Sequence, residues 1–202
     1  MYQQTLKHTQ TVFELTRDDP LAYAHLSFGP YDAVEEYEKL VEMLEEDEFA
    51  FAFAILLCDR EEEEMVGTIA YYDANTEDRS IEISFVQIFA KHRCRGFAMD
   101  AGRLLMEYAL TPVVEGGLGL ARVEWHASTA NRGSIAVARR LGFEEIGVVR
   151  YERCLKNGKE RGKVGNGRSE VPPGSEPGDL WRDLVMFAVY WDTWGGERRK
   201  IS

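Results

Sequence analysis

Cysteine is scarce in this chain of 202 residues, and no two cysteines form a close pair. The three are Cys58, Cys94 and Cys154, an odd number at wide spacings without a Cys-x-x-Cys pair. This pattern excludes a disulfide framework and a zinc site built on paired cysteines, so we expect no metal site. Free cysteines suit a reducing compartment, which predicts a cytoplasmic protein.

Long apolar runs are also missing. No stretch approaches the roughly 18 consecutive apolar residues of a transmembrane helix. The first ten residues, MYQQTLKHTQ, contain no apolar core of the length found in signal peptides. Both absences predict a soluble protein without a membrane as its partner.

Basic residues are outnumbered, with 24 lysines and arginines against 35 aspartates and glutamates. The net charge of −11 repels the phosphates of nucleic acids and of anionic membranes. The same field attracts a partner that carries amino groups. We therefore expect no nucleic-acid partner.

The apolar patterns predict both strands and helices along the chain. Strands are expected at 11–15, 51–59, 65–74, 80–90, 121–128, 144–153 and 181–191, and helices at 18–30, 31–48, 96–110 and 131–143. The strand–helix–strand succession from Ser80 to Ser128 predicts a crossover inside an otherwise antiparallel meander. The expected class is therefore mixed, α/β or α+β.

Residues 156–179 have the composition of a loop. They contain six glycines and three prolines with scarcely an apolar residue. Such a segment buries too little surface to offset the entropy lost on ordering, so we expect a long mobile loop. The glutamates of the turn expected at 60–64 are interpreted as a solvated surface feature.

A basic turn directly precedes the helix expected at 96–110. It carries Lys91, Arg93 and Arg95, and Gly96 stands where the helix begins. Helix N-termini present free N–H groups and a partial positive charge, which phosphate groups satisfy. The turn therefore predicts an anion site, and a solvated basic turn is the alternative.

Two blocks of sequence carry a family resemblance. Residues 93–98, RCRGFA, resemble the acyl-CoA signature of the GNAT superfamily of N-acyltransferases, Q/R-x-x-G-x-G/A. The second block, 131–150, resembles the N-x-x-S…LGF…G…R segment of the same superfamily. Segments near both ends further resemble the branch that includes the ribosomal-protein alanine acetyltransferases. The resemblance covers about residues 11–192, apart from 156–179, which looks like an insertion in one domain of 1–202.

The resemblance implies a mostly antiparallel mixed sheet of about seven strands flanked by about four helices. It also implies acetyl-CoA as co-substrate. The residues that it places on acetyl-CoA are Arg93, Cys94, Arg95, Gly96, Phe97, Ala98 and Asn131, together with a bulged strand at Phe85, Val86, Gln87 and Ile88. The broken alternation at Phe85 and Val86 is compatible with that bulge.

Transfer to an amine requires an amine that has lost its proton, so a base is useful. Glu82 is the first candidate, because it lies on the polar face of its strand and the resemblance implies a glutamate base there. His126 on the next strand is the second candidate. A surface position for Glu82 and a structural role for His126 are the alternatives.

The departing thiolate needs a proton or a hydrogen bond. Many relatives supply a tyrosine three residues before the LGF triplet, and here that position is Ala138. Ser134 and Asn131 are the candidate substitutes, since a hydroxyl one turn into the helix can reach the sulfur. Their alternative roles are a helix-surface residue and a helix cap.

Two classes of function remain open. The first is an enzyme, monomer or homodimer, that moves an acetyl or larger acyl group to a primary amine on a small molecule or a protein N-terminus. The second is a binding module that kept the phosphate turn and lost catalysis. The presence of Glu82, Ser134 and Asn131 together favours the enzyme.

Overall fold

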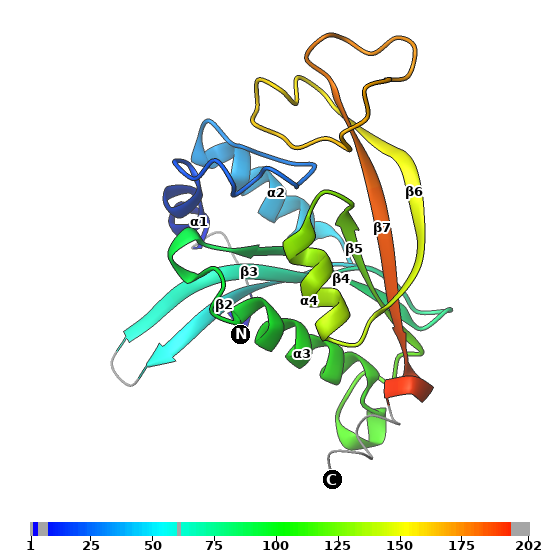
Figure 1. The fold of residues 1–202 in the computed structure, drawn as a ribbon. Helices are drawn as coiled ribbons and strands as arrows, with labels where there is room; N and C mark the ends of the chain where they lie inside the picture. Colours follow the sequence, from blue (N-terminus) through cyan, green and yellow to red (C-terminus); the bar gives the residue numbers. More distant parts are fainter. Residues whose placement is uncertain (1, 4–7, 60–61, 195–202) are drawn as a thin grey trace.

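A seven-stranded sheet forms the centre of the molecule, described in a computed structural model for residues 2–3, 8–59 and 62–194. The strands are β1 (Tyr2–Gln3), β2 (Phe51–Asp59), β3 (Glu62–Asn75), β4 (Ser80–Ile88), β5 (Arg122–Ser128), β6 (Glu144–Leu155) and β7 (Leu180–Tyr190). They lie in the order β1-β2-β3-β4-β5-β7-β6 (Figure 1). Of the pairs described, β4 with β5 is parallel and the others are antiparallel. The mixed, mostly antiparallel class is confirmed.

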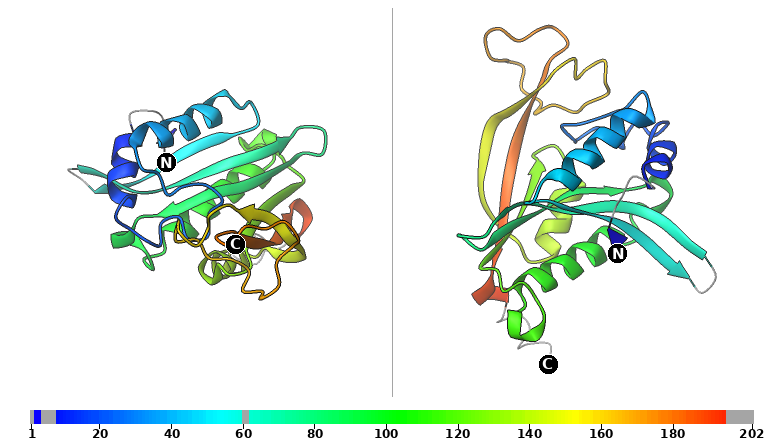
Figure 2. Two further views of the ribbon diagram at one scale, coloured as in Figure 1. Left: turned by 90° about the horizontal axis from the view of Figure 1, so that it is seen from above. Right: turned by 180° about the vertical axis from the view of Figure 1, so that it is seen from behind.

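Helices cover both faces of this sheet (Figure 2). One face carries α1 (Thr9–Thr16) and α2 (Val34–Glu46), and the other carries α3 (Phe97–Leu110) and α4 (Arg132–Arg140). The main core lies under α3 and α4 and includes the fully buried Trp125. No helix in the described part of the chain has the length and apolarity to cross a membrane.

The parallel strands β4 and β5 pair at one end only. Residues Ser80–Glu82 face Arg122–Glu124, and no further pair joins the two strands in the described residues. The two strands diverge beyond that point (Figure 1). The expected bulge is present in β4, where Ser84–Gln87 holds one residue more than the facing part of β3. Phe85 takes a positive φ of 52° at this bulge.

Three local predictions are wrong, and the first two concern residues 11–15 and 60–64. Residues 11–15 belong to α1 and not to a strand, because Thr9, Val12 and Thr16 recur at helical spacing and are buried together. The turn expected at 60–64 does not include residues 62–64, because β3 already begins at Glu62 and pairs there with the end of β2; positions 60–61 lie outside the described residues. A run of glutamates therefore extends a strand pair and does not interrupt it.

The helix expected at 18–30 is absent, because this segment bonds to a distant one. The buried ammonium of Lys163 donates to three of its carbonyl oxygens. These belong to Tyr23 (3.0 Å), Leu26 (2.9 Å) and Phe28 (2.6 Å). Residues 156–179 contain no helix or strand, and these bonds tie their first half to the N-terminal segment. That the rest is mobile stays a prediction.

Candidate functional site

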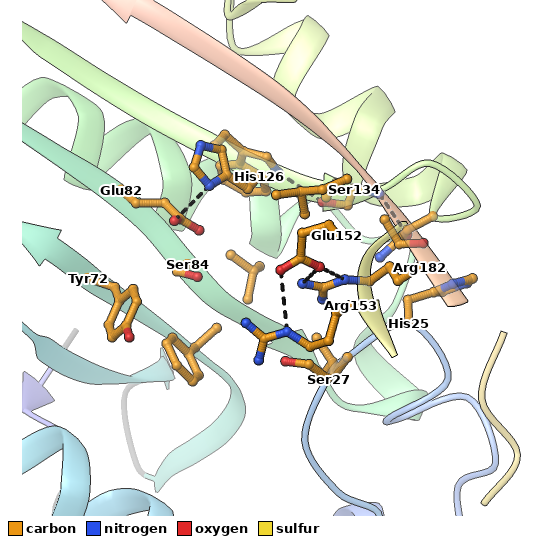
Figure 3. Close-up of a pocket in the computed structure, with 18 of the residues that line it drawn as sticks. His25, Ser27, Tyr72, Glu82, Ser84, His126, Ser134, Glu152, Arg153 and Arg182 are labelled. Carbon is orange, nitrogen blue, oxygen red and sulfur yellow. Dashed lines mark hydrogen bonds and ion pairs between the residues drawn. The ribbon is translucent and has the colours of Figure 1, made fainter. Parts of the chain in front are cut away.

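A cavity of about 340 Å³ opens where β4 and β5 separate. Residues 25–28, Tyr72 and Asp73 of β3, the start of α4, and the strands β6 and β7 complete its walls (Figure 3). The polar side chains that line it include Glu82, Ser84, His126, Asn131, Ser134, Glu152, Arg153 and Arg182. The fold thus brings the candidate bases and the candidate thiolate partners to one cavity of the size used for small ligands.

The two candidate bases contact each other. His126 Nδ1 lies 2.9 Å from Glu82 Oε2, and His126 Nε2 lies 3.0 Å from Glu124 Oε2. Arg122 Nε in turn donates to Glu124 Oε1 at 2.6 Å. Residues two apart in a strand share a face, so the pairing of β4 with β5 aligns these four side chains on one face.

Both ring nitrogens of His126 face carboxylates. Burial of the imidazole opposes its charged form, but the hydrogen bond with Glu82 and the negative charges of Glu82 and Glu124 outweigh burial. Together they raise the pKa of His126 above its ordinary value of 6.5. A charged imidazole has two N–H donors and no free lone pair. In that state His126 orients Glu82 and does not accept a proton.

Ser134 and Asn131 meet at the start of α4. The Asn131 side chain accepts from Ser134 N at 3.1 Å, which confirms the predicted helix cap and leaves the amide NH₂ free of that role. The buried Trp125 donates its Nε1–H to Ser134 Oγ at 2.9 Å. With one lone pair occupied in this way, the Ser134 hydroxyl keeps its own hydrogen to donate. Ala138 is fully buried in the main core, so the position of the missing tyrosine does not face the cavity.

The basic turn ends at Gly96, which caps α3 with a φ of 93°. A Cβ at Gly96 would come no closer than 3.9 Å to another side chain, that of Asp100, so the space in front of the turn is open. The N–H groups of Phe97 and Ala98 begin the helix and have no earlier turn to accept them. Cys94 also takes a positive φ, of 60°. This geometry fits a phosphate held by backbone amides.

The arginines of this turn have different partners. Arg93 donates to Asp19 through both terminal nitrogens, and its Nε donates to Ile88 O at 3.1 Å. Its guanidinium therefore joins the turn to the segment after α1, and its charge is already paired. Arg95 lies over the ring of Phe97 at 5.4 Å and has no acidic partner among the described residues. Arg95 is the cation of the turn that remains available for an anion.

The residues of the bulged part of β4 make different contacts. Phe85 stacks on Phe28 with ring centroids 5.3 Å apart, and its carbonyl accepts from Thr68 Oγ1. Val86 lines the cavity. Gln87 and Ile88 return to pairing with β3. The strand edge toward β5 has no partner strand here, so its backbone is accessible to a bound chain.

Sequence reasoning missed Glu152, Arg153 and Arg182. Arg182 donates to Glu152 Oε2 from Nε at 2.9 Å and from Nη2 at 2.7 Å, and Arg153 Nε donates to Glu152 Oε1 at 3.3 Å. Strict alternation places neighbouring residues of a strand on opposite faces. A bulge in β6 brings both Glu152 and Arg153 to the cavity, and no local signal marks that bulge. In the described residues, no group of His, Cys, Asp and Glu could hold a metal ion.

Sequence comparison places the chain among known proteins. The family model Acetyltransferase (GNAT) domain matches residues 3–144. The Uncharacterized N-acetyltransferase YoaA of Bacillus subtilis (strain 168) is 29% identical over 91 residues, 45% of this chain and 48% of that protein. The match therefore spans about half the length of this curated relative.

Solved structures share the fold. A probable acetyltransferase (GNAT family) from Chromobacterium violaceum ATCC 12472 superposes with a TM-score of 0.72 at 22% identity, over 96% of this chain and 83% of that one. The spermidine N-acetyltransferase of Vibrio cholerae in complex with CoA and spermine gives a TM-score of 0.67 at 16% identity, over 95% of each chain. At these identities the likeness concerns the fold.

Proposed function

We propose, because the chain belongs to the GNAT acetyltransferase family, that it moves an acetyl group from acetyl-CoA to a primary amine by direct attack in a ternary complex. The observation that carries this proposal is the Glu82–His126 pair in a cavity that opens between the diverging strands β4 and β5. The open amide turn at Gly96 supports it independently. Acetyl-CoA supplies the activated acyl group as a thioester.

The chain's own groups suit acetyl-CoA at three places. The backbone amides from Cys94 to Ala98, with Arg95, would hold the phosphates. The free edge of β4 from Phe85 to Ile88 would bind the pantetheine amides, and the Asn131 amide would bind the same arm. The paired guanidinium of Arg93 would position the turn without binding phosphate.

Glu82 is the proposed base and His126 its positioning residue. The proton leaves the ammonium of the acceptor for a Glu82 carboxylate oxygen, directly or through water, and the nitrogen lone pair becomes free to attack. His126 holds that carboxylate through Nδ1–H and is itself held by Glu124. Ser134 donates its hydroxyl hydrogen toward the departing sulfur, and Trp125 fixes the direction of that hydroxyl.

The proposal also concerns which kind of amine accepts the acetyl group. Resemblance to the ribosomal-protein alanine acetyltransferases favours an α-amino group, whose lower pKa makes deprotonation by a carboxylate easier than for a lysine. The alternative of a binding module without catalysis is favoured by one observation, the absence of a tyrosine hydroxyl at Ala138.

Thiol release from acetyl-CoA, measured with a panel of primary amines, tests the proposal. Acetylation of at least one class of amine, confirmed by the mass of the product, is the expected result. Tight CoA binding in calorimetry with no thiol release from any amine would favour the binding module and overturn the enzyme.

A further inference from the structure

One wall of the cavity carries a guanidinium that the proposed chemistry does not use. It belongs to Arg153, whose side chain is 55% exposed and extends between Ser84 and Ser27 in the view of Figure 3. Its Nε donates to Glu152, and its two terminal nitrogens have no hydrogen-bond partner within the described residues. The two unpaired donor groups face the space that an acceptor would enter.

The other charged side chains that line the cavity pair with each other, so the charges of Arg153 and Asp73 remain. Arg182 occupies Glu152 with two hydrogen bonds, so that pair is neutral by itself. The hydrogen bond and the raised pKa of His126 similarly favour opposite charges in its contact with Glu82. What remains at the cavity is the cation of Arg153 and the exposed carboxylate of Asp73 at its rim.

A bulge in β6 directs the side chain of Arg153 toward the cavity. The bulge in β6 inserts two residues between Val149 and Arg153 relative to β7, and Tyr151 takes a positive φ of 53° there. The buried carboxylate of Asp183 accepts from Tyr151 N at 2.9 Å and binds Arg168 as well. A carboxylate with several donors fixes this bend, so the direction of Arg153 is determined by the strand and not only by its rotamer.

We propose that the acceptor is an amine that also carries an anionic group, and that Arg153 binds that group while Glu82 faces the amine. This inference rests on the proposed function. A guanidinium binds a carboxylate or phosphate through two parallel N–H donors, which gives both charge and direction. The two ends of the acceptor then fix its position between β4 and β6.

This assignment separates the chain from the spermidine enzymes that share its fold. A polyamine presents only cations, and it would bring like charge to Arg153 and leave the guanidinium donors unpaired. An amine with an anionic end places its amino group at Glu82 and its anion at Arg153.

Three compounds with one four-carbon chain test the inference: 4-aminobutyrate, 1,4-diaminobutane and butylamine. The full chain with acetyl-CoA should use the aminocarboxylate with a kcat/KM about tenfold or more above that of the other two. A series of aminocarboxylates with two to six carbons shows which length spans the distance between Glu82 and Arg153. Aminoalkyl phosphates show whether the site prefers a phosphate to a carboxylate. Calorimetry with the same compounds gives a binding readout that does not depend on turnover.

Two variants complete the test. Arg153→Gln should bring kcat/KM for the best amino acid probe down to that of the uncharged amine of equal length, with the loss mainly in KM. Asp73→Asn removes the opposite charge at the same rim and should retain the preference for an anionic end.

The outcomes separate the two proposals. If the kcat/KM for butylamine or 1,4-diaminobutane equals or exceeds that for every anionic probe, the inference is overturned and the proposed function stands. If no amine releases thiol, the proposed function fails. The inference is then decided by whether an anionic probe binds the wild-type chain more tightly than Arg153→Gln in calorimetry.

Discussion

At the scale of single residues, the contact between Glu82 and His126 supports different proposed roles for the two side chains that the sequence offered as alternative bases. The carboxylates on both sides of His126 stabilise its charged form, and in that form the imidazole has no free lone pair to accept a proton. Glu82 lines the cavity, whereas Glu124 does not. The same network therefore offers the proposed base, Glu82, and a matched control, Glu124.

Glu82→Gln keeps the shape of the side chain and removes its basicity. We expect kcat/KM to fall by roughly 10²- to 10⁴-fold, with the loss shrinking as pH rises and the amine deprotonates unaided. The pH–rate profile checks this. Glu124→Gln should reduce kcat/KM much less. An unaltered pH–rate profile in Glu82→Gln would exclude Glu82 as the base.

The raised pKa of His126 predicts a pH-dependent contribution to stability. The folded state binds the His126 proton more tightly than the unfolded state, so the stabilisation is fully present below the ordinary pKa of 6.5. It is lost as pH rises through the raised folded value. Thermal unfolding of the wild type and His126→Gln across this window should show a difference that shrinks with rising pH. A difference independent of pH would contradict the assignment.

At the scale of elements, the N-terminus of α3 is built by a glycine in a conformation that other residues adopt with strain. The cap leaves the first amides of the helix pointing into open space, and this is the feature expected to bind phosphate. The role of the turn thus depends on its backbone more than on its arginines, since Arg93 is already paired.

Gly96→Asp introduces a negative charge and a side chain at this cradle. Calorimetry should show that CoA affinity falls more than about tenfold, because the new carboxylate repels the phosphates and occupies the space in front of the amides. Gly116→Asp is the matched control, since Gly116 has a similar φ of 89° and open space around it. Equal CoA affinity in Gly96→Asp and the wild type would place the phosphate site elsewhere.

At the scale of the whole molecule, Lys163 joins two segments that lie about 140 positions apart in the chain. Its three carbonyl partners belong to the segment whose residues 25–28 line the cavity. The wall of the candidate site therefore depends on the long segment before the last strand. Burial, followed by the charges of Arg161 and Arg182, lowers the pKa of Lys163 to about 8.

Lys163→Met removes the donor that the partly buried carbonyl oxygens of Leu26 and Phe28 share, whereas Tyr23 O keeps the N–H of Leu26. We expect the free energy of unfolding to fall by about 1–3 kcal/mol, and the Tm to fall by several degrees. Lys159→Met is the control, because the exposed Lys159 makes one bond within the same segment. An unchanged Tm in Lys163→Met would show that this contact does not hold the wall.

The lowered pKa of Lys163 also predicts that the difference in stability between the wild type and Lys163→Met depends on pH. Between pH 8 and 10.5 the unfolded chain binds the Lys163 proton and the folded chain releases it. The stability of the wild type relative to Lys163→Met should therefore rise with pH across this window. A fall over the same window would mean that Lys163 stays charged when folded.

The sequence by itself determined the features whose causes lie within a few residues. The cap of α4 at Asn131 and the start of α3 at Gly96 follow from side chains and patterns that act locally, and the family resemblance implied the bulge near Phe85. The order of the later strands and helices follows from apolar periodicity for the same reason. The family resemblance rests on the same local blocks.

Only the tertiary structure decided which of these residues meet. Glu82 and His126 pair because β4 and β5 align in parallel at one end, and Arg153 reaches the cavity because Asp183 holds a bulge in another strand. The segment 18–30 lost its expected helix to bonds from Lys163. Contacts of this kind join positions tens to more than a hundred residues apart, and their energies leave no periodic pattern in the sequence around either partner.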